Sequence, residues 1–264
     1  MRTKLPVVLG VMLFVRAAHA GGDAPAESLV LPEVSPQASP RPWLYLDDPT
    51  TPRPMAVTVH TRVTYTNASA SAKPFAFDVA HRGGVIEAGA EVGVLPWLAL
   101  TATGYGAGAD GTAGAIGGLR AALLPNGGST HLILGGGALR DLSGATGAWG
   151  SAAFEQDAGR ARFGATVRVA HAFAGGRDAL DTTASAGASY AVAGPVRAGA
   201  EWVGQDLEGA VDHEEAEGGM RHFAGPSASV ELMERRLTVV GGPAFGLSRG
   251  APPLVGRLSI AYAF

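Results

Sequence analysis

The sequence contains no cysteine among its 264 residues. This absence excludes disulfides, iron–sulfur centres, thiol nucleophiles and the lipid-modified cysteine of a lipoprotein. Charge is also scarce, because Asp, Glu, Lys and Arg make up 16% of the chain, against about 25% in average soluble domains. The net charge of −3 gives no reason to expect a nucleic-acid partner. After the N-terminal region no apolar run approaches about 18 residues, so no transmembrane helix is predicted.

Glycine and apolar residues are what the chain has in excess. Glycine accounts for 39 of the 264 residues, about twice its usual share of about 7%. Apolar residues form 47% of the chain and are spread along it by alternation with small or polar residues. A membrane-spanning β-barrel needs this pattern, because each strand faces lipid on one side only.

The N-terminus predicts export. A short basic start at Met1–Lys4 precedes the apolar run Leu5–Val15, and Ala18-His19-Ala20 forms a small-x-small cleavage site. These features predict a cleaved signal peptide over residues 1–20.

A proline-rich stretch follows. Residues 21–54 contain eight prolines and little periodicity, which predicts an extended periplasmic leader. The leader has one apolar cluster, Trp43–Leu46. We expect this cluster to belong to a partly ordered linker; docking at the barrel rim or entry into the lumen as a plug are the alternatives.

From Met55 onward the chain alternates with period two. In one example, Ile86 and Ala88 alternate with Glu87 and Gly89, as expected for a strand with one apolar and one polar face. The pattern predicts twelve strands, at 55–66, 83–95, 97–107, 112–124, 129–140, 144–156, 160–173, 182–193, 195–205, 222–233, 236–247 and 254–264.

The connections between these strands support a barrel. Links after even-numbered strands are tight and rich in turn formers, whereas several links after odd-numbered strands are longer, as at 67–82 and 206–221. Outer-membrane barrels have short periplasmic turns, longer external loops and an even strand count. The predicted fold class is therefore all-β: a single antiparallel transmembrane β-barrel of about twelve strands over residues 55–264. Ten to fourteen strands remain open, because residues 75–81 can form an extra strand.

The C-terminal strand carries the most specific signal. Leu258, Ile260, Tyr262 and the terminal Phe264 share one face of residues 255–264. This segment resembles the C-terminal insertion signal of bacterial outer-membrane β-barrels, which end in Phe preceded by apolar residues at every second position. The resemblance implies the outer membrane of a Gram-negative bacterium, with membrane lipid and the barrel-assembly machinery as partners. A monomer is expected. A soluble secreted β-protein, with this face buried by a second sheet, is the competing fold.

Charged residues fall repeatedly on the opposite face, which would line the barrel interior. The favoured function is a narrow porin-like channel for small polar solutes; a polar core that fills the barrel and conducts nothing is the alternative. The predicted pore-lining residues are His60, Arg62, Glu87, Glu91, Arg120, Arg162, Arg168, Arg197, Glu201, Glu231 and Arg257.

Other functions have weaker signals. A non-conducting structural or adhesion barrel would act through its external loops, especially residues 206–221. A barrel hydrolase, similar to the outer-membrane phospholipase or the omptin-type proteases, would need a nucleophile–base pair at the rim, for which Asp212-His213 is the nearest candidate. The acidic residues of loop 206–221 do not match the twelve-residue calcium loop. No catalytic residue, metal or cofactor is therefore predicted.

Overall fold

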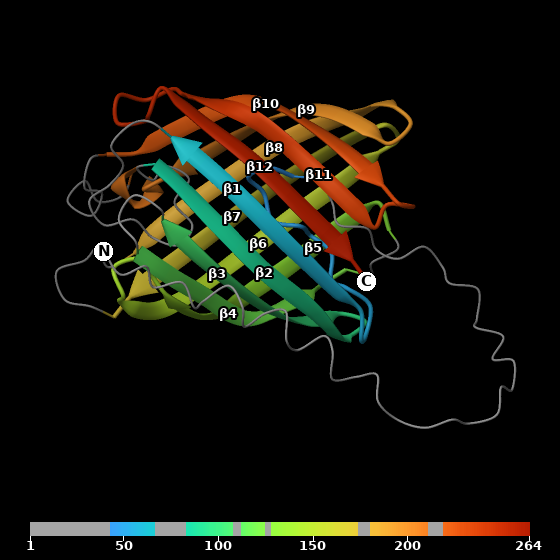
Figure 1. Cartoon of the computed structure of the whole chain (residues 1–264), viewed down its shortest axis with the longest axis horizontal. Coiled ribbons are helices and arrows are strands. Elements are labelled where there is room, and N and C mark those ends of the chain that lie inside the picture. The colour runs from blue at the N-terminus through green and yellow to red at the C-terminus, as the bar shows by residue number, and fades with distance from the viewer. Residues whose placement is uncertain (1–42, 67–82, 108–111, 125–127, 174–179, 211–218) are drawn as a thin grey trace, which may run out of the picture. The chain divides into compact units, whose positions relative to one another are not determined.

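The computed structural model describes residues 43–66, 83–107, 112–124, 128–173, 180–210 and 219–264. Within these residues twelve strands close into one barrel, in which every strand pairs antiparallel with its sequence neighbours and β1 pairs with β12 (Figure 1). The strands are β1 (Val57–Thr66), β2 (Gly83–Leu95), β3 (Leu98–Ala107), β4 (Thr112–Ala122), β5 (Thr130–Arg140), β6 (Thr146–Ala158), β7 (Ala161–Ala172), β8 (Asp181–Ala193), β9 (Val196–Gln205), β10 (Arg221–Leu232), β11 (Leu237–Gly246) and β12 (Leu254–Ala263).

The predicted fold class is confirmed. Each strand end lies within two residues of its predicted position. A single-turn 3-10 helix, η1 (Leu207–Ala210), follows β9, and no helix of the described ranges is long and apolar enough to cross a bilayer. Both residues 75–81 and the predicted signal peptide at 1–20 lie outside the described residues.

Side chains alternate between the outer and inner surfaces of the wall. On β12, Leu258 and Ile260 are 46% and 42% exposed, whereas Arg257 and Ser259 beside them are buried. Successive residues of a strand point to opposite faces, so a closed sheet places one set against its surroundings and the other in its lumen. The outer surface is thus the apolar one.

The barrel closes where its first and last strands meet. The β1–β12 ladder runs from Thr58 opposite Ala263 to Thr66 opposite Val255. The backbone N–H of Phe264 extends it by donating to the Val57 carbonyl at 2.9 Å. The ring of Phe264, 56% exposed, packs edge-on against Tyr262 with 4.8 Å between ring centroids. The terminal aromatic therefore stands on the outer surface beside the closing seam.

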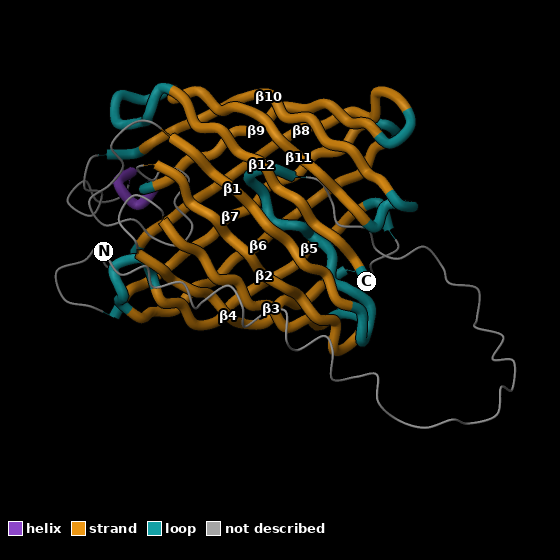
Figure 2. The backbone as a smooth tube through the Cα atoms, in the orientation of Figure 1, coloured by secondary structure: helices purple, strands orange, loops and turns teal. Residues whose placement is uncertain are grey.

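Residues 43–54 are called here the lumenal segment; residues 43–52 lie buried or half-buried inside the barrel, and Pro54 at the end of the segment is exposed (Figure 2). All four residues of the apolar cluster Trp43–Leu46 are at most 4% exposed. The partly ordered linker expected for this cluster is therefore not what the structure shows, and the cluster takes the lumenal alternative; residues 21–42 of the predicted leader lie outside the described residues. The reason is physical: an apolar cluster left in water gains by burial, and small inward-facing residues of the wall leave room for it.

Three glycines of the wall provide that room. A Cβ atom at Gly187 of β8 would lie 2.9 Å from Trp43, and one at Gly164 of β7 would lie 2.8 Å from Leu46. At the other end of the segment, a Cβ at Gly93 of β2 would overlap the carbonyl oxygen of Arg53. The segment follows the wall so closely at these points that no larger residue fits without a shift.

Candidate functional site

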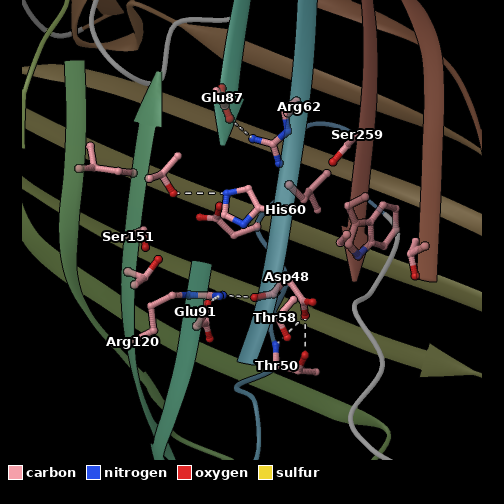
Figure 3. Close-up of a pocket in the computed structure, with 18 of the residues that line it drawn as sticks. Asp48, Thr50, Thr58, His60, Arg62, Glu87, Glu91, Arg120, Ser151 and Ser259 are labelled. Atoms are coloured by element: carbon pink, nitrogen blue, oxygen red, sulfur yellow. Dashed lines mark hydrogen bonds and ion pairs between the residues drawn. The ribbon is translucent and has the colours of Figure 1, made fainter. Parts of the chain in front are cut away.

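The eleven residues predicted to line a pore all have side chains on the inner face of the barrel or at its lumenal edge. Seven of them surround one cavity of about 160 Å³ between the lumenal segment and the wall formed mainly by β1–β4, β11 and β12. Figure 3 shows side chains from β1, β2 and β4 converging on this space. That these residues line a conducting path stays a prediction. The seven are His60, Arg62, Glu87, Glu91, Arg120, Arg168 and Arg257.

One group of charges joins the three strands at the closing seam. Arg62 of β1 stands opposite Glu87 of β2, and Arg62 Nη1 lies 2.9 Å from Glu87 Oε2. From β12, Arg257 Nη2 reaches the other carboxylate oxygen, Glu87 Oε1, at 3.4 Å. One glutamate thus holds two arginines, so this side of the cavity carries more positive than negative charge.

A second ion pair bridges over β3. Arg120 of β4 forms an ion pair with Glu91 of β2 across β3, where Ala99 lies opposite Arg120 and Thr101 lies opposite Glu91. Arg120 also donates through Nη2 to the backbone carbonyl of Asp48 in the lumenal segment (Figure 3). This arginine therefore links the wall to the segment.

A bidentate ion pair, Arg168–Asp47, also links the wall to the segment. The Arg168 guanidinium on β7 donates to both carboxylate oxygens of Asp47, with 3.0 Å from Nε to Oδ2. The Asp47 backbone N–H donates to Thr166 Oγ1 at 3.1 Å. Two parallel bonds from one guanidinium to one carboxylate form the bidentate geometry that makes such pairs strong and directional.

The apolar end of the segment is held by two buried glutamates. Glu201 of β9 accepts the backbone N–H groups of Leu44 at 3.0 Å and Tyr45 at 2.8 Å. Glu155 of β6, which is fully buried, accepts the indole N–H of Trp43 at 2.5 Å. Glu201 was predicted to line a pore, but the structure places it beneath the segment and outside the cavity lining.

The other three predicted residues lie away from the cavity. Arg162 pairs with Asp157 at 2.9 Å, and Glu231 pairs with Arg235 at 3.4 Å. Arg197 Nε donates to Ser189 Oγ at 3.2 Å near the short β8–β9 turn. These contacts belong to the end of the barrel at which the tight turns lie.

The sequence prediction missed Glu155 and Asp47. Glu155 follows the inward alternation of β6, so a face assignment for that strand would have found it. Nothing in the sequence around Asp47 indicated contact with Arg168, because the lumenal segment has no strand periodicity.

Two groups of side chains among the described residues have metal-ligand composition: His131, Glu155 and Asp157, and Asp181, Asp206 and Glu208. Several already have protein partners, such as Asp206 with Arg221 at 3.3 Å and Glu208 with the backbone of Thr182 at 2.7 Å. Neither group is assigned as a metal site. The Asp212-His213 candidate and most of the acidic loop lie outside the described residues.

Comparison with known proteins places the fold. No protein-family model matches the chain, and no curated protein matches it. Among solved structures, the outer-membrane channel COG4313 of Pseudomonas putida F1 superposes with a TM-score of 0.51 at 12% identity, over 85% of this chain and 99% of that one. The NanC porin superposes with a TM-score of 0.50 at 10% identity, over 77% of this chain and 98% of that one.

The chain has the fold of a bacterial outer-membrane β-barrel. The resemblance drawn from the C-terminal strand is thereby confirmed at the level of the fold. At these identities the likeness extends to the architecture and not to a substrate or a mechanism.

Proposed function

We propose that this protein is a porin-like channel for small polar solutes in which the lumenal segment narrows the path. One observation carries the proposal: a closed barrel with an apolar exterior encloses a cavity of about 160 Å³ lined by charged and hydroxyl side chains. At about 30 Å³ per molecule, this volume corresponds to about five waters, so the space beside the segment suits small solutes only.

The same proposal includes the location and partners of the protein. The apolar outer surface would face outer-membrane lipid, and the terminal Phe264 would serve as the signal for the barrel-assembly machinery. Residues 1–20 would act as a cleaved signal peptide that delivers the chain to the periplasm. Each barrel would act as a monomer; among the described strands the ladder is closed, so two copies cannot pair through an edge strand.

The lumenal segment is built to be displaced without unfolding the wall. Its contacts with the barrel are hydrogen bonds and ion pairs with side chains, such as those of Asp47 and Trp43, and the packing of Leu44 and Tyr45 in a buried apolar cluster of the wall. The ladders of the wall run between strands and do not include residues 43–53. Release of the segment would therefore widen the lumen and leave the barrel closed.

Single-channel recording tests the proposal. The refolded chain from Gly21 is compared in planar bilayers with a variant lacking residues 43–52. Discrete conductance steps are expected for both proteins, with larger or more frequent steps for the deletion variant. Heat-modifiable migration on gels serves as the control for folding.

A second candidate is a non-conducting barrel whose external loops bind a partner. The burial of Trp43–Leu46 against the wall favours it, because a stably filled lumen conducts nothing. If both proteins fold and neither conducts, the channel proposal fails and this candidate takes its place. A barrel hydrolase is the third candidate, and no contact of the described residues favours it.

A further inference from the structure

We propose that Arg168 and Arg120 form a binding site for small organic anions that carry a carboxylate. In the structure, residues Asp47 and Asp48 of the lumenal segment occupy this site. The inference rests on the proposed channel function and adds to it a substrate class.

The first support is the charge of the cavity wall. Four arginines and two glutamates of the strands line the cavity, so the wall alone carries an excess of positive charge. The lumenal segment adds two carboxylates, Asp47 and Asp48, which balance this excess. When the segment is displaced, the part of the lumen around these arginines would therefore attract anions, whereas Glu155 and Glu201, which hold Trp43, Leu44 and Tyr45, would be uncovered elsewhere in the lumen. The wall charges are Arg62, Arg120, Arg168, Arg257, Glu87 and Glu91.

The second support is geometric. The Arg168 guanidinium grips the Asp47 carboxylate through two N–H groups, and its side chain is only 9% exposed. The two N–H groups of this guanidinium, called here the fork, are thus already oriented as a free carboxylate would require. The position of Arg168 on the rigid β7 strand keeps them oriented when Asp47 leaves. An arginine that extended freely into water would have to be ordered on binding.

Further donors stand beside this fork. Thr166 accepts the Asp47 N–H at 3.1 Å, and its hydroxyl would be available to a second oxygen of a solute. Arg120 would lose its bond to the Asp48 carbonyl and regain a free N–H group. The guanidinium carbon of Arg257 lies 5.0 Å from the centroid of the Tyr45 ring, a cation–π contact. Arg257 would lose this contact when the segment leaves. Displacement of the segment therefore uncovers several cationic donors together.

Cations find no comparable site in the same cavity. Each glutamate of its wall is already bound by arginine: Glu87 by Arg62 and Arg257, and Glu91 by Arg120. A cation would have to displace a guanidinium from its carboxylate, whereas an anion replaces only the Asp47 carboxylate, which leaves together with the segment. The geometry therefore selects for negative solutes.

The first arm of the test measures ion selectivity. The variant lacking residues 43–52 is placed in a KCl gradient, and the reversal potential is recorded. A unit positive charge about 4 Å from a permeating ion in water raises the occupancy of chloride about fivefold and lowers that of potassium about fivefold, so chloride is expected to be favoured over potassium about 25-fold. Arg168→Gln in the same background should reduce this preference. Arg235→Gln, which removes an arginine whose side chain is 72% exposed, should leave it unchanged.

The second arm measures block of the current by succinate, added as its potassium salt. Loss of a charge-assisted bidentate pair costs about tenfold or more in affinity, so Arg168→Gln should raise the half-blocking concentration by at least that factor. Arg168→Lys keeps the charge but removes the fork. The lysine variant should retain the chloride preference and lose most of the succinate block. If Arg168→Gln fails to fold, Arg168→Lys takes its place in the test.

The outcomes separate the two proposals. Absence of conductance in every folded variant overturns the channel proposal itself. Conductance without chloride preference overturns the anion site and leaves the channel intact. The same conclusion follows if succinate blocks the Arg168→Lys variant as strongly as it blocks the protein that retains Arg168.

Discussion

Removal of the Trp43 side chain should loosen the lumenal segment more than any other single truncation. The indole is 4% exposed, fits against Gly164 and Gly187, and donates to the buried Glu155 at 2.5 Å. Truncation of a buried Trp to Ala costs about 3–5 kcal/mol, through lost transfer free energy and the cavity left behind. Here the cost falls on docking of the segment, because Trp43 precedes the barrel strands.

This cost converts into an equilibrium shift. At about 1.4 kcal/mol per factor of ten, Trp43→Ala should raise the ratio of displaced to docked segment by about two to three and a half orders of magnitude. The open probability in single-channel recordings should rise accordingly, and the current per channel should approach that of the 43–52 deletion.

Two companion variants give the experiment its resolution. Trp43→Phe removes the N–H donor to Glu155 and part of the ring system but keeps an aromatic ring in the site, so its effect should be smaller than that of alanine, about tenfold to a hundredfold. Trp97→Ala removes an indole of the same size that is 52% exposed in the turn between β2 and β3, and it should leave gating unchanged. Equal open probabilities for wild type and Trp43→Ala, with both proteins folded, would refute the gating role of the segment.

Three other changes have defined outcomes. Gly93→Val places a side chain where the Arg53 carbonyl now lies and should make residues 43–54 cleavable by added protease while the barrel stays heat-modifiable; unchanged protection would contradict the close approach seen there. Glu201→Gln replaces a carboxylate that accepts the backbone N–H groups of Leu44 and Tyr45 by an amide, which is a weaker acceptor on one side and a donor on the other. Docking of the lumenal segment should weaken by about 1–3 kcal/mol, measured as an increase in open probability. Phe264→Ala should lower the yield of barrel inserted in the outer membrane, measured by membrane fractionation, with little effect on the conductance of the refolded protein; normal insertion would show that the terminal aromatic is not the assembly signal.

The strands were predictable because their physical cause is local. Alternation such as that of Leu258, Arg257 and Ile260 reflects a wall with lipid-facing and lumenal sides, and this requirement acts on every strand separately. The tight turns and the charged inner face follow from the same pattern. Accordingly, strand positions and the inward direction of Arg62 and Glu87 agree with expectation.

The lumenal segment could not be predicted in this way, because its position depends on non-local fit. Trp43 is buried only because Gly164 and Gly187, more than 100 residues later in the sequence, leave space for it. The proline content of the lumenal segment indicated an extended chain but did not indicate where that chain would run. The alternation of β7 places Arg168 on the inner face. It does not indicate which residue Arg168 contacts there, so the ion pair with Asp47 could not be predicted.

The covalent connection between the lumenal segment and β1 makes Asp47 an intramolecular ligand. The segment stays attached to Val57 after it leaves its site, so its local concentration does not depend on how much protein is present. Short flexible tethers give effective concentrations of about millimolar order. The docked segment is also held by Trp43, Leu44 and Tyr45, so a free carboxylate would have to exceed that concentration by the factor that these contacts contribute. The barrel would then respond to abundant solutes and stay narrow when they are scarce.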